Sequence, residues 1–419
     1  MEKYLGNKKR ILKNIGDIVD SLNVDKGVFL DVFAGTNNVA KFFKKKGFKI
    51  ITNDINECSA IFSRATIEND RVPNFGKIVK RYNLRSICND ALVRKYFLLN
   101  SNGYKYSWND FKSTERNLVY ALTFLSFIDN FRPLFKEEKG FEIYPLIFNN
   151  YCPGGRRSSY KSPSGIIAKR MFFTDEHGKH IDFILNLLKY WKNKGLISES
   201  EFNILLSTLV HAATLFSNTS GVYEAFYKTW FPNTRQEFRL PVPDLETIRK
   251  PKGKSYCMDV GYFVLHFKKS VDVLYIDPPY NTRQYDSNYH LLNTLVKFNE
   301  IKDLKDFEKQ ITGVRGQNRE YVFRSPFSSR KTFTQAMENL VQNIDAKYVL
   351  ASYFDGDDNL WNEEGNATGI KILSAILSNP IYFKQKSLKV FKIPRQNFQS
   401  RSGRKKKIVN ELVFCAERK

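Results

Sequence analysis

The run Asp277-Pro278-Pro279-Tyr280 could activate an aromatic amine. The lone pair of such an amine is delocalised into its ring, so the nitrogen is a poor nucleophile. The Asp277 carboxylate and the Pro278 carbonyl could each accept one amino hydrogen and localise that lone pair for in-line attack on a sulfonium methyl. The two prolines stiffen the loop, and Tyr280 offers a ring on which an extruded base could stack. These four residues are the predicted catalytic residues.

An ordinary tight turn is the alternative interpretation of this run. The apolar stretch Val271–Ile276 precedes it directly and is typical of a buried strand. In open α/β sheets, ligands bind at the carboxyl ends of such strands. The position of the run therefore favours a catalytic role.

A second candidate site follows another apolar run, at 28–33. The chain continues through small residues that allow a ligand to approach the backbone closely. It lacks the three-glycine pattern of a dinucleotide site, which argues against a bound pyrophosphate. The predicted cofactor contacts in this turn are Asp31, Phe33, Ala34, Gly35 and Thr36.

Three further acidic residues could bind the same cofactor. Asp54 ends the next predicted strand, where an acidic residue typically binds ribose hydroxyls, although a helix N-cap would also place an aspartate there. Asp259 is the candidate for contact with an adenine ring, and Asp90 competes for that role.

The elements around these residues predict an α/β fold. A helix is expected at 10–22, a strand at 28–33, a helix at 39–46 and a strand at 48–52, which together form a βαβ unit of a parallel sheet. Further strands are expected at 256–260, 271–276, 347–353, 387–393 and 408–415, with a helix at 332–344.

The middle of the chain has a different pattern. Helices are expected at 115–130, 179–195, 199–217 and near 218–230, and 151–165 is expected to be a basic, flexible loop. His177 and His180 are expected in an exposed turn. We therefore predict a mainly helical inserted domain at 61–250, which interrupts a Rossmann-like sheet domain formed by 1–60 and 251–419.

Composition points toward a polyanionic partner. Lys and Arg number 67 against 43 Asp and Glu, a formal net charge of +24, and nucleic acid is the usual partner of such a surface. The five cysteines are scattered, so neither a zinc site nor a disulfide framework is predicted. The N-terminus lacks a signal-peptide core, and no apolar stretch is long enough to span a bilayer, so a cytoplasmic protein without a membrane partner is expected.

These motifs together resemble the Dam-like (alpha) class of DNA adenine methyltransferases. Lys3-Tyr4-Leu5-Gly6-Asn7-Lys8 is similar to the opening Lys-Trp-x-Gly-Gly-Lys of that family, with Tyr for Trp and Asn for Gly. Phe33-Ala34-Gly35, Asn53-Asp54-Ile55-Asn56 and Asp277-Pro278-Pro279-Tyr280 match its later motifs in order. The basic segment 401–407, before Asn410-Glu411-Leu412, resembles the segment that precedes its last strand.

The resemblance implies a Rossmann-like methyltransferase sheet with an inserted target-recognition domain, S-adenosyl-L-methionine as cofactor, and transfer to the N6 nitrogen of an adenine flipped out of duplex DNA. Tyr4, Lys8, Asp54, Ile55 and Asp277 would contact the cofactor, and Asp277 would also hold the target base. A host-protective role with a cognate restriction endonuclease is expected from the family alone; marking DNA for replication or mismatch repair is equally compatible. The family does not transfer a recognition sequence.

Basic residues in several loops are candidates for DNA contact, because Arg and Lys bind phosphates and base edges. A solvated loop is the alternative for each of them, but as a set they fit a positive cleft. They are Arg132, Arg156, Arg157, Lys161, Arg319, Arg324, Arg401, Arg404 and Lys405.

Other functions remain open. An RNA adenine methyltransferase could use the same catalytic run, and a protein-amide methyltransferase could too, although those enzymes tend to have Asn in place of Asp277. A catalytically inactive DNA-binding protein would not need Asp277. A nuclease would need carboxylates around a metal, and Pro243-Asp244 is not followed by the Glu-x-Lys that would complete such a site.

Overall fold

The computed structural model describes residues 8–101, 106–162, 164–279, 285–318, 323–354, 368–396 and 408–419. These residues form two compact units. The sheet unit consists of the described parts of 6–63, 250–286 and 323–419, and the helical unit of those of 64–249 and 287–322. We had expected 287–322 to belong with the sheet. Each unit is described by itself below.

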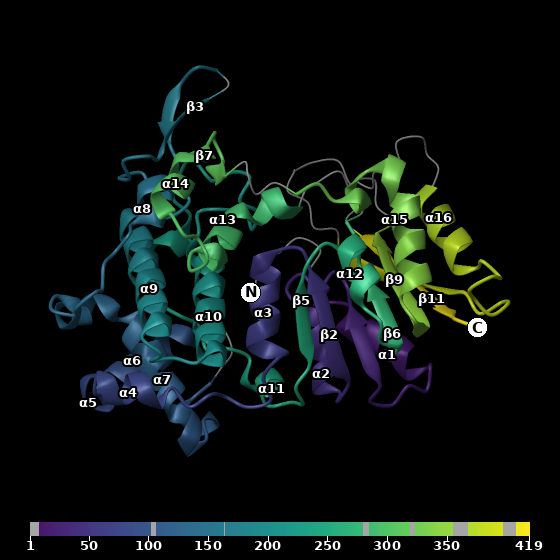
Figure 1. Cartoon of the computed structure of the whole chain (residues 1–419), viewed down its shortest axis with the longest axis horizontal. Coiled ribbons are helices and arrows are strands. Elements are labelled where there is room, and N and C mark those ends of the chain that lie inside the picture. The colour runs from purple at the N-terminus through teal and green to yellow at the C-terminus, as the bar shows by residue number, and fades with distance from the viewer. Residues whose placement is uncertain are drawn as a thin grey trace. The chain divides into compact units, whose positions relative to one another are not determined.

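The sheet unit confirms the predicted α/β fold. Its seven-stranded sheet has the order β10-β11-β9-β6-β1-β2-β5 (Figure 1). Neighbouring strands from β5 to β9 are parallel, whereas β11 is antiparallel to both β9 and β10. The strands are β1 Val28–Asp31, β2 Lys49–Asp54, β5 Lys254–Cys257, β6 Val271–Ile276, β9 Ala346–Phe354, β10 Lys389–Gln396 and β11 Ile408–Glu417.

Helices cover both faces of this sheet because β1 is apolar on both sides. Leu30 and Val32 pack in a core with residues of α12, α15 and α16. Phe29 points the other way and stacks on Phe43 of α2, with ring centroids 4.1 Å apart. The helices of this unit are α1 Leu12–Asp20, α2 Asn38–Lys45, the first part of α3 Glu57–Thr66, α12 Val260–His266, η6 Pro326–Ser328, α15 Arg330–Asn343 and α16 Thr368–Leu377.

Most of the predicted elements of this unit are present, with shifted ends. At 256–260 the strand ends at Cys257, and Asp259 instead caps α12 by accepting the Tyr262 N–H at 3.2 Å. An N-cap carboxylate satisfies an amide that the first helical turn leaves without a partner. The predicted strand was therefore wrong in its second half.

The helical unit is built around two long helices that pack against each other, α9 Asp175–Asn193 and α10 Glu199–Phe216 (Figure 1). Ser198 and Glu201 form a capping box that starts α10. Its other elements are α4 Gly76–Arg81, α5 Leu84–Ile87, α6 Asp90–Asn100, η1 Trp108–Asp110, η2 Ser113–Glu115, α7 Arg116–Ser126, η3 Ile128–Phe135, α8 Leu146–Tyr151, β3 Ser159–Lys161, β4 Ile167–Lys169, η4 Pro232–Arg235, α11 Leu245–Ile248, most of α13 Tyr285–Lys297, α14 Leu304–Lys309, β7 Ile311–Thr312 and β8 Gln317–Asn318.

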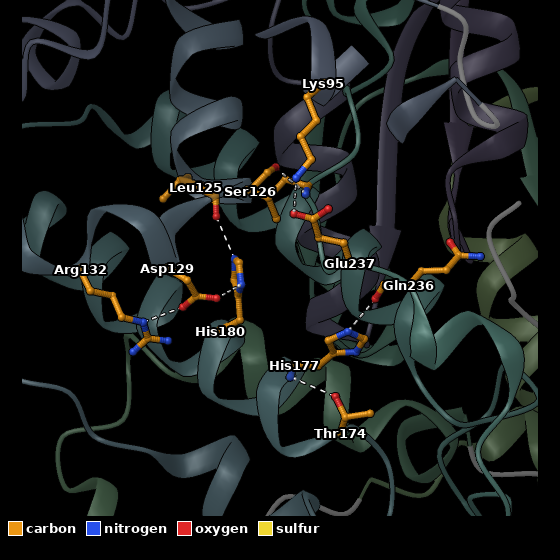
Figure 2. A network of polar contacts seen from close by, with 11 residues as sticks. Lys95, Leu125, Ser126, Asp129, Arg132, Thr174, His177, His180, Gln236 and Glu237 are labelled. Atoms are coloured by element: carbon orange, nitrogen blue, oxygen red, sulfur yellow. Dashed lines mark hydrogen bonds and ion pairs between the residues drawn. The ribbon is translucent and has the colours of Figure 1, made fainter. Parts of the chain in front are cut away.

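The two histidines expected in an exposed turn are buried on α9. Thr174 caps this helix by accepting the His177 N–H, so the helix begins before the predicted start. His180 Nε2 lies 2.9 Å from the Leu125 carbonyl oxygen and His177 Nε2 lies 2.9 Å from that of Gln236 (Figure 2). The intervening Gly178 and Lys179 suggested a turn, but Gly178 packs against α8, where a Cβ would meet Cys152.

Two other expectations for the helical unit were wrong. The segment 218–230 is irregular rather than helical, because the buried Asn218 takes over its backbone groups: its side chain donates to the Tyr227 carbonyl at 2.8 Å and accepts from the Phe231 N–H at 3.1 Å. The predicted flexible loop 151–165 contributes the first strand of the antiparallel β3–β4 hairpin, in which Lys161 pairs with Ile167.

Membrane-spanning helices and metal-binding clusters are absent from the described residues. No helix in the described ranges is long and apolar enough to cross a bilayer. Over the same residues, no cluster of three or more His, Cys, Asp or Glu side chains could hold a metal ion.

Candidate active site

The end of β6 places the predicted catalytic run beside the predicted cofactor turn. Asp277 follows β6 directly, and β6 pairs with β1 so that Tyr275 lies opposite Asp31. Because parallel strands end at the same edge of a sheet, Asp277 and the turn after Asp31 share that edge. Pro278 is buried and Pro279 half-buried, and Tyr280 lies outside the described residues.

Asp277 belongs to a chain of four alternating charges. Its Oδ1 lies 2.9 Å from Lys8 Nζ, and Lys8 also donates to Glu411 Oε1 at 2.5 Å. The second oxygen of Glu411 accepts from Arg395 Nε at 2.8 Å. The side chain of Glu411 is 0% exposed and that of Lys8 5%, whereas that of Asp277 is 16% exposed. Solvent is therefore excluded from Glu411 but has partial access to Asp277.

The surroundings of Asp277 make it a weaker acid than usual. Burial is the main cause and Glu411 adds to it, while Lys8 acts in the opposite direction, with the result that the pKa of Asp277 is raised to about 6. At neutral pH this carboxyl is still mostly ionised and can accept hydrogen bonds.

Buried polar side chains fix the backbone of the predicted cofactor turn. Gly35 has φ of +50°, a conformation that glycine adopts without strain. Its N–H donates to Asp54 Oδ2 at 2.8 Å, and its carbonyl accepts from the Ser59 hydroxyl at 2.5 Å. Asn37 also has positive φ and hydrogen-bonds to Ser59 and Ser63. These contacts fix the backbone at 34–37.

Buried carboxyls line the same edge. Burial, and then the nearby Asp277 and Asp54, raise the pKa of Asp31 well above its usual value. Burial also raises the pKa of Asp54, which accepts from Asn56 N–H at 2.9 Å as well as from Gly35. Asp31 Oδ1 makes no hydrogen bond within the described structure. Asp54 is therefore a link between two turns rather than a simple N-cap.

The two candidates for the adenine contact fall in different units. Asp259 follows β5, the edge strand beside β2, and belongs to the sheet unit. Asp90 is an exposed residue in the first turn of α6, in the helical unit. Phe33, Ala34, Thr36 and Ile55 lie in the two turns after β1 and β2, where they were predicted.

The predicted DNA contacts are only partly accounted for. Arg319, Arg401, Arg404 and Lys405 lie outside the described residues, as does Tyr4, a predicted cofactor contact. Arg156, Arg157 and Lys161 are exposed at or near the β3–β4 hairpin, although Arg156 also pairs with Glu308 at 3.3 Å. Arg324 is exposed in the sheet unit.

Arg132 is more engaged than its sequence context suggested. Its Nε donates to Asp129 Oδ1 at 2.6 Å (Figure 2). Its guanidinium lies over the Phe183 ring. Asp129 and Asn130 line a cavity of about 550 Å³ in the helical unit together with His177 and His180. The described lining of this cavity belongs to the helical unit alone.

The sequence analysis gave no role to Glu411 or Arg395. Glu411 was noted only as part of a motif, and Arg395 was not noted. One signal was available: a carboxylate within the apolar strand 408–417 needs a buried partner. The identity of that partner depends on strand order, which the local pattern does not contain.

Comparison with known proteins identifies the family. Residues 4–353 match the model of the D12 class N6 adenine-specific DNA methyltransferase family. The chain is 28% identical to the type II methyltransferase M.FokI of Planomicrobium okeanokoites over 99% of its own length, and 28% identical to the modification methylase StsI of Streptococcus sanguinis over 100%. It is 28% identical to the type II methyltransferase M.NlaIII of Neisseria lactamica over 84% of its length and 82% of that protein.

The chain spans about half the length of the first two relatives, 52% of each. The family model, in contrast, covers the N-terminal motif, the cofactor turn, the catalytic run and β9 continuously. Together with the order of strands and the placement of Asp277 at the carboxyl end of β6, this match shows that the chain belongs to the D12 class of N6 adenine-specific DNA methyltransferases.

Proposed function

We propose that this chain transfers a methyl group from S-adenosyl-L-methionine to the N6 nitrogen of an adenine flipped out of duplex DNA, at a specific sequence. The observation that carries the proposal is the position of Asp277: a partly exposed carboxylate beside the turn at Gly35, backed by a buried lysine. Family membership supports the reaction type.

The chemistry of the site fits this cofactor. S-adenosylmethionine carries a sulfonium and an ammonium group, and Asp31, Asp54 and Asp277 form an acidic edge in which the other two carboxylates raise the pKa of Asp31. A cation beside them would relieve that repulsion. Asp31 Oδ1 also offers an acceptor without a described partner. When bound, the cofactor supplies a methyl group activated by its sulfonium.

Each residue then has a defined task. Asp277 accepts a hydrogen bond from one N6 hydrogen and the Pro278 carbonyl accepts one from the other, which turns the nitrogen lone pair toward the methyl donor. As the N–C bond forms, the sulfonium S–C bond would break, S-adenosylhomocysteine would leave, and the surplus proton on N6 would pass to water. Gly35 and its neighbours Phe33, Ala34 and Thr36 let the cofactor approach the backbone. Asp54, Ile55 and Asp259 take the nucleoside part, Lys8 and Tyr4 complete the cofactor side, and Tyr280 stacks on the flipped base.

The helical unit is proposed to recognise the DNA target. The hairpin face that carries Lys161 and Lys169 is exposed, and Arg156 and Arg157 precede it. Phosphate contacts of this kind make binding salt-dependent, with a slope of about −0.9 per contact in a plot of log affinity against log salt. We expect Lys161→Ala to reduce that slope by about one contact, as measured by fluorescence anisotropy; an unchanged slope would remove Lys161 from the interface.

The decisive experiment is methyl transfer from labelled S-adenosylmethionine to duplex DNA, with the product mapped by sequencing that detects N6-methyladenine. Asp277→Ala should lower the rate about a hundredfold to a thousandfold, as expected for loss of one preorganised partner of the reacting group. Asp20→Ala is the matched control, because Asp20 pairs with Lys46 on the exposed surface of the same unit.

The outcomes separate the alternatives. Transfer to matched RNA but not to DNA would identify an RNA methyltransferase. Unchanged transfer by Asp277→Ala would refute the catalytic assignment. DNA binding without transfer under any condition would leave a DNA-binding protein.

A protective role in a restriction–modification system is the biological part of the proposal. The relatives named above are described as type II methyltransferases or modification methylases. Genomic DNA from cells that express the chain should become resistant to an endonuclease that cuts at the methylated sequence. Methylation without an endonuclease of that specificity in the source organism would favour a marking role instead.

A further inference from the structure

Glu411 is fully buried in the sheet unit and lies far from the catalytic run in sequence. It reaches the site because β11 runs antiparallel to β9, so that the start of β11 lies at the edge where β6 and β9 end. Glu411 pairs with Phe354 at the last position of β9. A C-terminal residue is thus placed behind the catalytic carboxylate.

Both oxygens of Glu411 are used. One accepts from Lys8 Nζ at 2.5 Å and the other from Arg395 Nε at 2.8 Å. Arg395 is fixed on its other side by the Phe354 ring, 4.8 Å from the guanidinium carbon. The side chain of Arg395 is 20% exposed, whereas Glu411 is 0% exposed. A carboxylate in that position cannot reach solvent or substrate, and its contacts are to the two cations.

We propose that Glu411 is a positioning residue for methyl transfer: it holds Lys8 in place behind Asp277 and offsets the charge of Lys8, so that Asp277 remains a strong hydrogen-bond acceptor. This rests on the proposed function. Asp277, Lys8, Glu411 and Arg395 together carry no net charge. Without Glu411 the two cations would act on Asp277 alone, and a carboxylate held by more positive charge accepts a substrate hydrogen bond less strongly.

The network predicts opposite effects for two substitutions. Glu411→Gln removes a negative charge behind Lys8, and Arg395→Met removes a positive charge behind Glu411. The acid limb of the pH profile of kcat/KM reports ionisation of Asp277 in the free enzyme. We expect Glu411→Gln to move this limb down by about one pH unit and Arg395→Met to move it up by a similar amount.

Glu417→Gln is the matched control. Glu417 lies on the same strand and pairs with Lys384 at 2.5 Å, but its side chain is 29% exposed and its partner is on the surface. This variant should leave the pH profile unchanged. A merely structural role for Glu411 would lower kcat in both network variants without displacing the acid limb in opposite directions.

A second readout is independent of turnover. Binding of S-adenosylmethionine, measured by calorimetry from pH 5 to pH 8, should show the same opposite displacements, because Asp277 is placed beside the cofactor turn. If Glu411→Gln does not fold, the upward shift in Arg395→Met carries the test alone. Shifts in the same direction, or none, would overturn the inference. Cofactor binding that shifts as expected in a protein unable to methylate DNA would support Glu411 and refute the proposed function.

Discussion

Two sets of buried charged groups, one in each unit, are bonded in different ways. In the sheet unit, Lys8 and Glu411 are paired with other charged side chains. In the helical unit, Arg170 is 2% exposed and donates to backbone carbonyls, those of Gly313, Asn150 and Arg157, at 2.6 to 3.1 Å.

Asp182 follows the same pattern as Arg170. Its carboxylate is 1% exposed and accepts the N–H groups of Ile147 and Phe148, both at 2.8 Å, in the first turn of α8. A charged group that is hydrogen-bonded to the backbone fixes the course of the chain. In a network of paired charged side chains, substitution of one residue changes the electrostatic environment of the others. Arg170 and Asp182 therefore fix the course of the backbone in the helical unit, whereas Lys8 and Glu411 set the state of Asp277 in the sheet unit.

Removal of the central cation should have the largest effect. Lys8→Met leaves Asp277 and Glu411 as two buried carboxylates without the lysine, and one-sided loss of a buried pair costs about 3–5 kcal/mol. We expect that loss of unfolding free energy in denaturant titration, together with loss of methyl transfer. Lys13→Met, an exposed lysine on α1, should leave both within error. A stable and active Lys8→Met would show that the charges of the sheet unit do not depend on one another.

Removal of the buried cation Arg170 in the helical unit should cost less unfolding free energy than removal of Lys8. Arg170→Met leaves the carbonyls of Gly313, Asn150 and Arg157 without this donor, and hydrogen bonds to charged groups contribute about 1.5–3 kcal/mol. We expect a loss of about 2–3 kcal/mol of unfolding free energy, and the same acid limb of kcat/KM as in the wild type. Lys302→Met is the control, since that side chain is exposed in the same unit. A displaced acid limb would contradict a purely structural role for Arg170.

A smaller effect distinguishes the two units by the pH dependence of the unfolding free energy. Burial raises the pKa of Asp277 from 3.8 to about 6, so the folded protein holds this proton more tightly than the unfolded chain. The resulting stabilisation is complete below about pH 4 and is lost as pH rises through about 6. The unfolding free energy of wild type relative to Asp277→Asn should therefore fall across this window, measured by denaturant titration. The difference between wild type and Arg170→Met should stay constant there, and a parallel fall would contradict the distinction.

The sequence by itself predicted the fold class and the two loops that the sheet brings to one edge. Val271–Ile276 followed by Asp277-Pro278-Pro279-Tyr280, and the turn at Gly35 after 28–31, are local patterns in which a strand and its following loop lie within a few residues. Parallel pairing of β6 with β1 then placed both at one edge. Local signals were sufficient because residues adjacent in the chain form each half of this site.

Only the tertiary structure decided which charged residues support Asp277 and how the middle of the chain is organised. Glu411 and Arg395 join Lys8 because β11 is inserted between β9 and β10 in reverse direction, and strand order does not follow from the pattern of any single strand. Burial of His177 and His180 likewise depended on their contacts with Gln236 and Leu125, and the irregular course of 218–230 on the side chain of Asn218. Contacts between residues distant in the chain are set by three-dimensional packing, and hydrophobic periodicity does not encode them.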